Sequence, residues 1–376
     1  MPRTALITDA DGIAGRALLK HLVDCTTKDE WARIVVNTRS TTHCKTSDDR
    51  IHFVNLDFSQ RPGTLIEQMT GPCANITHAF FCSYVHEGIF EELNKANAEL
   101  FENFLLALTA AATALANVTL LSSTRYYGSH ISPVPTPCRE GDARRGDPAD
   151  NFYHAQEDFL TMLQMNQNWT WNVIRPEPII SAAVVPGGFN IALSLAMYFM
   201  ITEQVVEEAR MPTNERCWNG IAAFSDAKLL AEFSVWAASN AECANQAFNF
   251  SNGDHFVWRF AWPLLADHFG AYSTPDQTFQ KPEPVRGMLQ QEFSLVEWAS
   301  DKKAVWGRVC EGTGILEARE SFSSASWSEL DSMLQRSWSA SVSVNKARKF
   351  GWTGFKDSFD CFVDAFEALR QENLLP

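Results

Sequence analysis

A glycine turn near the start of the chain is the first candidate for chemistry. Residues 8–15 (TDADGIAG) match the spaced pattern T-G-x-x-G-x-x-G at Thr8, Gly12 and Gly15, with Asp9 at the first glycine position. Glycines at this spacing let the backbone N–H groups of a helix N-terminus approach a pyrophosphate. We therefore predict a dinucleotide site at Thr8, Gly12, Ile13 and Gly15, with a purely structural turn as the alternative. The Asp9 carboxylate would face the phosphates, so we expect it to weaken binding.

The end of the second expected strand indicates which dinucleotide binds. A carboxylate there accepts hydrogen bonds from the ribose hydroxyls, whereas a basic residue pairs with an additional 2′-phosphate. Residues 37–40 (NTRS) contain no carboxylate. We therefore expect Arg39, helped by Thr38 or Ser40, to bind the 2′-phosphate of NADPH, and Asp57 to accept a hydrogen bond from the adenine amino group. The alternatives are a solvated arginine and a turn-capping aspartate.

The elements that must position these residues alternate between strand and helix patterns. Short apolar, partly β-branched runs predict strands, and longer segments with helical spacing of apolar residues separate them. The expected strands are 4–8, 33–37, 52–57, 77–82, 118–122 and 170–176, and the clearest helices are 16–23, 87–116 and 152–167. This alternation predicts an α/β fold with a doubly wound parallel sheet, which binds ligands outside the carboxyl ends of its strands.

From about residue 185 the alternation weakens and apolar helical segments dominate, at 189–201, 227–238 and 258–269. We expect residues 1–184 to form a Rossmann-like dinucleotide-binding domain. Residues 185–376 are expected to form a smaller, mainly helical substrate-binding region, with some segments returning to the sheet domain. Phe189, Met197 and Tyr198 are expected to line an apolar pocket for a terpenoid, polyketide or alkaloid-like substrate, with ordinary core packing as the alternative. Residues 274–286 contain three prolines and predict a loop or hinge.

Composition excludes several classes of protein. The 31 Lys and Arg residues against 45 Asp and Glu give a net charge of −14, which would repel a nucleic-acid backbone. The nine cysteines are scattered singly and the nine histidines show no metal-ligand spacing, which indicates reduced thiols and no metal. The 13-residue apolar stretch 189–201 is shorter than the about 20 residues of a membrane span. We expect a cytoplasmic protein with a small apolar substrate, and a homodimer is possible.

Further motifs along the chain are specific enough to indicate a family. They are residues 31–39 (WARIVVNTR), 77–81 (THAFF), 151–153 (NFY) followed by Glu157 and Asp158, 175–176 (RP), 224–226 (FSD), 247–254 (AFNFSNGD) and 350–355 (FGWTGF). The chain resembles the short-chain dehydrogenase/reductase superfamily and, within it, the progesterone 5β-reductase/iridoid synthase-like group, in a fungal-type version. The resemblance covers nearly the whole chain and is weakest between residues 274 and 346.

The resemblance implies an extended short-chain dehydrogenase fold and NADPH-dependent reduction of an enone, an enal or a carbonyl. It implies that the Tyr153 phenol binds the carbonyl oxygen while negative charge develops there, a role that needs a donor already in position. Arg125 stands where this family has a supporting lysine. We expect the remaining site residues to be Ser83, Ser122 and Ile179 at the cofactor, and Tyr84, Tyr127 and His154 at the substrate.

Two departures from the family pattern keep other functions open. Arg125 retains a positive charge but not the compact geometry of lysine, and Asp9 replaces a glycine. One alternative is therefore a redox-neutral cyclase, isomerase or dehydratase in which Tyr153, with His154, performs acid–base chemistry. A second alternative is a binding protein that keeps the sheet only as a scaffold.

Overall fold

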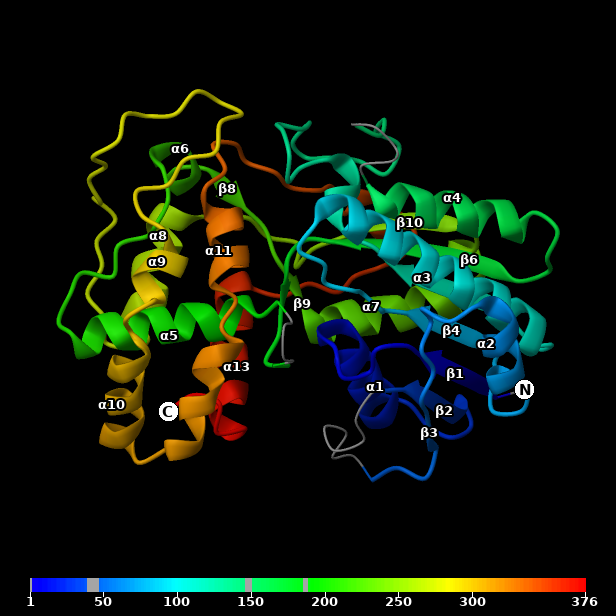
Figure 1. Ribbon diagram of the computed structural model, residues 1–376. Coiled ribbons are helices and arrows are strands. Elements are labelled where there is room, and N and C mark those ends of the chain that lie inside the picture. Colours follow the sequence, from blue (N-terminus) through cyan, green and yellow to red (C-terminus); the bar gives the residue numbers. More distant parts are fainter. Residues whose placement is uncertain (1, 39–46, 146–150, 185–188) are drawn as a thin grey trace.

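The computed structural model describes residues 2–38, 47–145, 151–184 and 189–376. Its centre is a seven-stranded parallel sheet in the order β10-β6-β5-β4-β1-β2-β3, shown in Figure 1. The strands are β1 (Arg3–Ile7), β2 (Trp31–Asn37), β3 (Ile51–Val54), β4 (His78–Phe81), β5 (Asn117–Leu121), β6 (Thr170–Pro176) and β10 (Gln246–Phe250). The predicted doubly wound parallel sheet is confirmed.

Apolar side chains alternate between the two faces of the sheet, and each face has its own layer of helices. On one face, Ala5 and Ile7 pack with α1 (Ile13–Cys25) and α7 (Ala227–Ser239). On the other face, Leu6 belongs to the core that is covered by the remaining helices of the sheet half. These helices are α2 (Pro62–Met69), α3 (Phe90–Ala111) and α4 (Phe152–Gln164). Both faces are buried, and every strand's carboxyl end points to the same edge.

The sequence predicted six of the seven strands and missed β10. This strand pairs in parallel with β6, with Gln246 opposite Asn172 and Phe250 opposite Pro176. It follows α7, far along the chain from the other strands, where the sequence pattern is mainly helical. Residues beyond 184 therefore supply an edge strand and also helices on the first face of the sheet, where α7 lies beside α1 and α12 (Asn345–Lys349) packs against β10.

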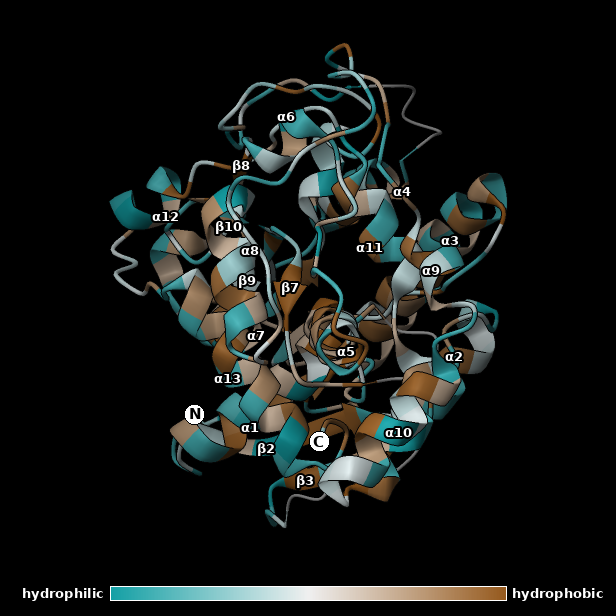
Figure 2. Cartoon of the chain, turned by 90° about the vertical axis from the view of Figure 1, so that its left-hand side faces the viewer, coloured by the Kyte–Doolittle hydropathy of each residue, from teal (hydrophilic) through white to brown (hydrophobic). Residues whose placement is uncertain are grey.

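The helical half is built around α5 (Ile191–Gln204), which is apolar on all sides and buried along nearly its whole length. Figure 2 looks along this helix and shows other helices arranged around it. The further helices are α6 (Glu215–Trp218), α8 (Trp258–Asp267), α9 (Leu295–Ala299), α10 (Lys303–Thr313), α11 (Trp327–Leu334), α12 (Asn345–Lys349) and α13 (Ser358–Gln371), with 3-10 turns at η2 (Thr124–Tyr127), η4 (Ala241–Cys243) and η5 (Leu316–Ser324). Two short strand pairs, β7 (Ile179–Ile180) with β9 (Ser225–Asp226) and β8 (Ile221–Ala222) with β11 (Phe256–Val257), complete the chain.

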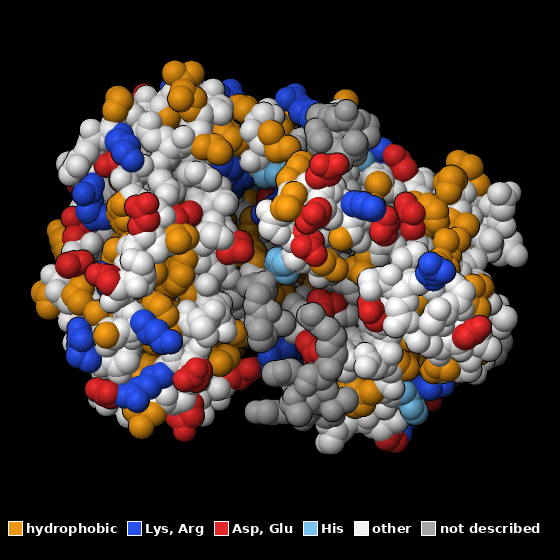
Figure 3. All heavy atoms as spheres, in the orientation of Figure 1, with side chains coloured by type: hydrophobic (Ala, Val, Ile, Leu, Met, Phe, Trp, Pro, Cys, Tyr) orange, Lys and Arg blue, Asp and Glu red, His pale blue; other side chains and the backbone are white. Residues whose placement is uncertain are grey.

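The surface carries charges of both signs. On the face in Figure 3, acidic and basic side chains are interspersed, and the surface is hollowed between the helical half and the sheet half. The predicted loop at residues 274–286 contains no helix or strand. Across the described ranges, no helix combines the length and apolar character that crossing a membrane requires.

Candidate active site

Thr8 ties the ends of two neighbouring strands together at the carboxyl edge of the sheet. Its side chain is fully buried, and Oγ1 accepts hydrogen bonds from the backbone N–H groups of Cys82 at 2.9 Å and Ser83 at 3.2 Å. These bonds hold the segment after β4 against the end of β1. Thr8 therefore positions the backbone of the predicted cofactor residue Ser83.

The glycine turn after β1 has little free space. Asp9 adopts a left-handed backbone with φ of +50°, a conformation that favours glycine. A Cβ atom at Gly12 would lie 2.1 Å from the Asp9 Oδ2 atom, and one at Gly15 would lie 2.2 Å from the Asp9 carbonyl oxygen. Gly15 is thus required for close packing of α1 on the turn, whereas the space beside Gly12 is occupied by a carboxylate.

The turn retains the main features of a phosphate site. Gly12 is the N-cap residue of α1 and brings no capping side chain, as is typical of helix N-termini that bind phosphate. The Asp9 carboxylate competes with a cofactor phosphate for the positive N-terminal end of α1. A pyrophosphate at this helix end requires the Asp9 side chain to move away from Gly12, so the turn fits a dinucleotide only when this charge is displaced.

Replacing Asp9 with glycine is expected to tighten NADPH binding about tenfold, because it removes a negative charge from the phosphate position and relieves the left-handed backbone. A fluorescence titration of the purified protein with NADPH measures this. Asp9→Asn is the matched control, since it removes the charge and keeps the side chain's size. Equal dissociation constants for the wild type and Asp9→Gly would show that the carboxylate does not occupy the phosphate position.

The ends of β2 and β3 are joined by side-chain hydrogen bonds. Asn37 Nδ2 donates to the Leu56 carbonyl at 3.1 Å, and Asn37 Oδ1 accepts from the Leu56 N–H at 2.8 Å. Asp57, which follows, is exposed and accepts from the Ser59 N–H and hydroxyl at 3.0 and 2.7 Å. This is the capping geometry that was the alternative for Asp57, and its contact with adenine stays a prediction.

The predicted 2′-phosphate residues fall partly outside the described ranges. Thr38 is buried, and its hydroxyl bonds to Asp11 Oδ2 in the glycine turn. Arg39 and Ser40 lie outside the described residues. Their role in binding NADPH therefore stays a prediction.

Asn151 brings the two predicted catalytic residues together. As N-cap of α4 it accepts a hydrogen bond from the Tyr153 N–H at 3.2 Å, and its Nδ2 donates to the Arg125 carbonyl at 2.9 Å. Arg125 lies on η2, which directly follows β5, and the Ser123 hydroxyl caps this turn by accepting from the Arg125 N–H. The N-F-Y motif thus fastens the start of α4 to the end of β5.

The Tyr153 phenol lies in a polar but desolvated setting. Burial raises its pKa to about 12, against the opposing effects of the Arg125 charge and a hydrogen bond with the Ser123 side chain. Arg125 also acts on Tyr84, whose pKa is raised mainly by burial. Because Tyr153 keeps its proton at neutral pH, it is a hydrogen-bond donor there, and the structure places Tyr84, Arg125 and Tyr153 in one electrostatic cluster.

Behind this cluster lies a buried ion pair. The guanidinium of Arg175 donates two hydrogen bonds to Glu157, at 2.9 and 2.6 Å, and both side chains are buried. Its Cζ atom lies 3.4 Å from the ring centroid of Tyr126. Glu157 follows Tyr153 by one helical turn. It therefore occupies the position that the lysine has in a Y-x-x-x-K motif, and its charge is balanced by Arg175.

Two predicted substrate residues belong to the same packed region. The Tyr127 hydroxyl donates to Asn249 Oδ1 at 2.7 Å and accepts from Arg175 at 2.9 Å. His154 is fully buried, its Nε2 lies 2.8 Å from the Tyr126 carbonyl oxygen, and burial lowers its pKa. These contacts describe packed side chains, and contact with substrate stays a prediction for both.

The other predicted residues divide between the sheet edge and the helical core. Ser122 is buried and its hydroxyl has no hydrogen-bond partner among the described residues, whereas Ile179 pairs with Ser225 between two short strands. Met197 and Tyr198 lie in the core around α5, with Phe189 packed against it. Core packing, the alternative at these three positions, accounts for their contacts, and their role in a pocket stays a prediction.

Sequence reasoning missed the acid at the end of β6. Glu177 directly follows Pro176, is 5% exposed, and accepts a hydrogen bond from the Thr124 hydroxyl at 3.2 Å. Burial raises its pKa to about 8, although Arg336 and the Thr124 hydroxyl both oppose the shift. The signal was present in the sequence, since a carboxylate at the carboxyl end of a predicted parallel strand stands where ligands bind.

This acid predicts a pH-dependent stability. Between its ordinary pKa of 4.5 and about 8, folded Glu177 holds a proton that the unfolded chain has lost, so its contribution to the free energy of unfolding falls as pH rises through this window. Glu177→Gln is expected to flatten this part of the profile. Urea unfolding of both proteins across the window measures it, and parallel profiles would contradict it. Arg336, Cys217 and Cys138 carry the other titratable groups around this carboxyl.

Comparison with known proteins identifies the family of the chain. The model of the PRISE-like Rossmann-fold domain family matches residues 5–366. The chain is 46% identical to short chain dehydrogenase gsfE of Penicillium aethiopicum, over all of both chains. It is 26% identical to the 3-oxo-Delta(4,5)-steroid 5-beta-reductase of Arabidopsis thaliana, over 99% of this chain and 93% of the relative.

Solved structures confirm the fold at low sequence identity. The structure of Gre2 in complex with NADPH from Candida albicans aligns with a TM-score of 0.64 and 11% identity, over 98% of this chain and 99% of Gre2. The family model matches nearly the whole chain, and the fungal relative is nearly half identical to it. The chain therefore belongs to the PRISE-like Rossmann-fold domain family of short-chain dehydrogenases.

Proposed function

We propose that the protein is an NADPH-dependent reductase of an activated C=C bond, in an enone or enal, or of a carbonyl, in an apolar specialised metabolite. The observation that carries this proposal is the neutral Tyr153 phenol, held beside the cationic Arg125 at the carboxyl edge of a dinucleotide-type sheet. In this proposal the sheet domain binds the dinucleotide and the helical region binds a small substrate. We place the reaction in the cytoplasm, and a homodimer is compatible with it.

The chain's own residues have distinct tasks in this reaction. Tyr153 donates a hydrogen bond to the substrate's carbonyl oxygen, and the Arg125 charge stabilises the negative charge that develops there. Asn151 positions both groups through its two hydrogen bonds. The glycine turn would hold the pyrophosphate of NADPH, which would supply the hydride, and a proton from the solvent would complete the reduction.

The relatives' names support this chemistry. A 3-oxo-Δ4,5-steroid is an enone, and the Arabidopsis relative is named as its 5β-reductase. Reduction of such a bond places negative charge on the carbonyl oxygen, which is the charge that a phenol and a nearby cation stabilise. We infer the same class of reaction here, with Arg125 in place of the family's lysine.

Consumption of NADPH tests the proposal. The purified protein is mixed with NADPH and either 2-cyclohexenone or a 4-en-3-one steroid, and absorbance of the reduced nicotinamide is followed together with product analysis. We expect consumption that depends on the enone and matches the amount of saturated ketone formed. No consumption with any enone or carbonyl probe, although NADPH binds, would refute the proposal.

One observation favours a second function, a redox-neutral cyclase, isomerase or dehydratase on the same fold. The Asp9 carboxylate fills the space beside Gly12 that a cofactor phosphate would approach. In this case Tyr153 performs acid–base chemistry without hydride transfer. Product formation by protein stripped of nucleotide would establish this function, and a strict requirement for NADPH would exclude it.

A further inference from the structure

A small cavity of about 40 Å³ lies between the end of β6 and the helical half of the molecule. Its walls come from the segment after β6, from α6 to β8, from α8, and from α11 with the loop that follows it. This is the side of the sheet where the strands' carboxyl ends lie, and therefore the side on which doubly wound folds bind ligands. The space is enough for one polar group or a few water molecules.

Glu177 supplies an unused hydrogen-bonding atom to this cavity. Its backbone is fixed because its N–H donates to the Phe250 carbonyl at 3.0 Å, and its Oε2 is held by the Thr124 hydroxyl. The other carboxyl oxygen, Oε1, is buried and has no hydrogen-bond partner within 3.5 Å among the described residues, although the Val342 N–H also acts on this carboxyl group. A buried polar atom without a partner is costly, so this arrangement calls for a ligand or water at Oε1.

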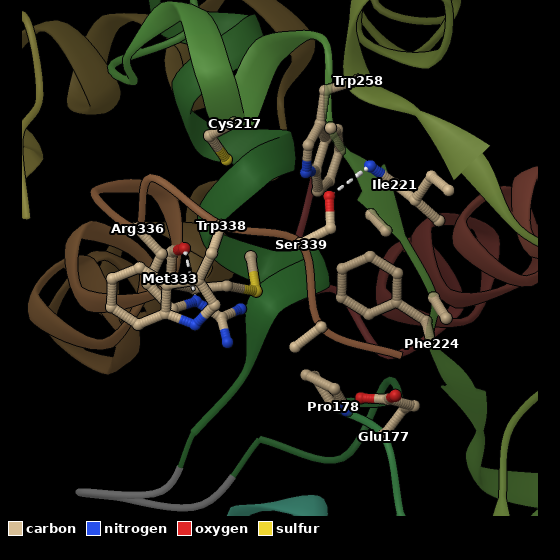
Figure 4. A pocket seen from close by; sticks show the side chains of 14 residues that line it. Glu177, Pro178, Cys217, Ile221, Phe224, Trp258, Met333, Arg336, Trp338 and Ser339 are labelled. Atoms are coloured by element: carbon tan, nitrogen blue, oxygen red, sulfur yellow. Dashed lines mark hydrogen bonds between the residues drawn. The ribbon is translucent and has the colours of Figure 1, made fainter. Parts of the chain in front are cut away.

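Arg336 faces the same cavity from another wall, as Figure 4 shows. Its guanidinium is held by backbone carbonyls, with Nε donating to Met333 at 3.2 Å and Nη1 to Ser129 at 3.4 Å. Within the described part of the chain, no ion pair closer than 4.0 Å joins Arg336 to Glu177. An acid and a cation thus share one cavity without neutralising each other by direct contact.

The remaining walls combine aromatic and aliphatic side chains with polar atoms. Phe224, Trp258 and Met333 border the cavity, and the hydroxyl of Ser339 is already occupied because it accepts from the Ile221 N–H at 2.8 Å. A group bound here therefore meets hydrophobic side chains as well as polar atoms, and Glu177 and Arg336 are the charged or acidic side chains among them. That combination suits an oxygen atom carried on an apolar skeleton.

The acid in the cavity wall and the proposed reaction centre are held by the same backbone segment at the start of η2. Thr124 bonds Glu177, while the preceding residue, Ser123, interacts with the Tyr153 phenol. One short segment therefore fixes the phenol and the buried acid relative to each other. A substrate whose carbonyl lies at Tyr153 has a second polar site within the same edge of the fold.

We propose that Glu177 and Arg336 form a second polar anchor, which binds a hydroxyl or carbonyl oxygen of the substrate remote from the carbonyl at Tyr153. Glu177 offers a carboxyl proton to this oxygen, consistent with the burial that keeps the acid protonated. The preferred substrate is then an apolar enone with a further oxygen substituent, not a plain hydrocarbon enone. This inference rests on the proposed function in one respect, which is that the substrate's carbonyl lies at Tyr153.

Matched pairs of ligands test the anchor. The probes are linear alk-3-en-2-ones of graded chain length, each with either a terminal methyl or a terminal hydroxyl group. Binding to the full-length protein without NADPH is followed by tryptophan fluorescence, because Trp258 and Trp338 border the cavity. At one chain length we expect the hydroxylated probe to bind about tenfold tighter than the methyl probe.

The variants separate the anchor from general packing. Glu177→Leu is expected to remove the tenfold preference, and Glu177→Gln to retain most of it, because an amide still donates and accepts. Met333→Leu, the matched change in the apolar wall, should shift both members of a pair equally. The proposal would be overturned if no chain length showed the preference, and equally if no probe bound. It would also be overturned if the preference survived in Glu177→Leu. Failure of NADPH consumption with the preference intact would refute only the reductase.

Discussion

Replacing Tyr153 with phenylalanine is expected to lower kcat/KM for NADPH-dependent reduction by about a hundredfold to a thousandfold, the effect of removing one preorganised donor from a developing oxyanion. The change removes only the hydroxyl, and the ring keeps its contact with Phe152 at a centroid distance of 4.1 Å. Folding should therefore be unaffected. Initial rates of NADPH oxidation with an enone measure the loss.

Tyr272→Phe is the matched control, since it makes the same chemical change at a side chain that is 68% exposed. Its rate and melting temperature should equal those of the wild type. If Tyr153→Phe retained activity within a few fold, the donor would have to be another group of the cluster. Tyr84 would then be tested by the same substitution, because the Arg125 charge acts on Tyr84 and Tyr84 in turn acts on Tyr153.

Replacing Glu157 with alanine is expected to reduce the free energy of unfolding by about 3–5 kcal/mol, because it leaves a buried guanidinium without its counter-charge. Arg175 is 3% exposed, and its two hydrogen bonds to Glu157 are the only carboxylate contacts that the described residues offer it. Urea unfolding of the wild type and the variant at neutral pH measures the loss.

Asp158→Ala provides the control on the same helix. Asp158 is the next residue and pairs with Arg144, but its side chain is 61% exposed, so its loss should cost at most about 1 kcal/mol. Equal losses in the two variants would mean that burial of the Glu157 pair has no special effect. A double replacement of Glu157 and Arg175 with apolar residues should recover part of the stability.

The sheet was predictable because parallel strands buried on both faces leave a strong local signal. Six runs of apolar, β-branched residues separated by helical spacing identified the strands from β1 to β6. The strand β10 was missed because its place in the sheet depends on a crossover from the helical half, which local periodicity does not record. Residues 246–250 therefore drew attention only as part of a family motif.

Site residues were predictable where their role depends only on neighbouring residues in the sequence. Thr8, Gly12 and Gly15 sit at a turn whose geometry follows from their spacing, and the structure shows that turn. The role of Asn151 was not predictable in this way, and for Glu177 only its place at the end of a strand could be read from the sequence. Each depends on a partner from another strand or turn, Arg125 in one case and Thr124 in the other, and such pairs become visible only when the chain is folded.

The return of the chain to the sheet through α7 and β10 has a consequence for engineering this family. The substrate half is not a module appended at one joint. The polypeptide leaves the sheet after β6, comes back for α7 and β10, departs again, and returns once more at α12, which packs against β10. Chimeras that exchange substrate preference between relatives therefore need paired junctions on both sides of α7 and β10. A fragment cut at residue 184 would leave β6 as a bare edge open to pairing with other chains.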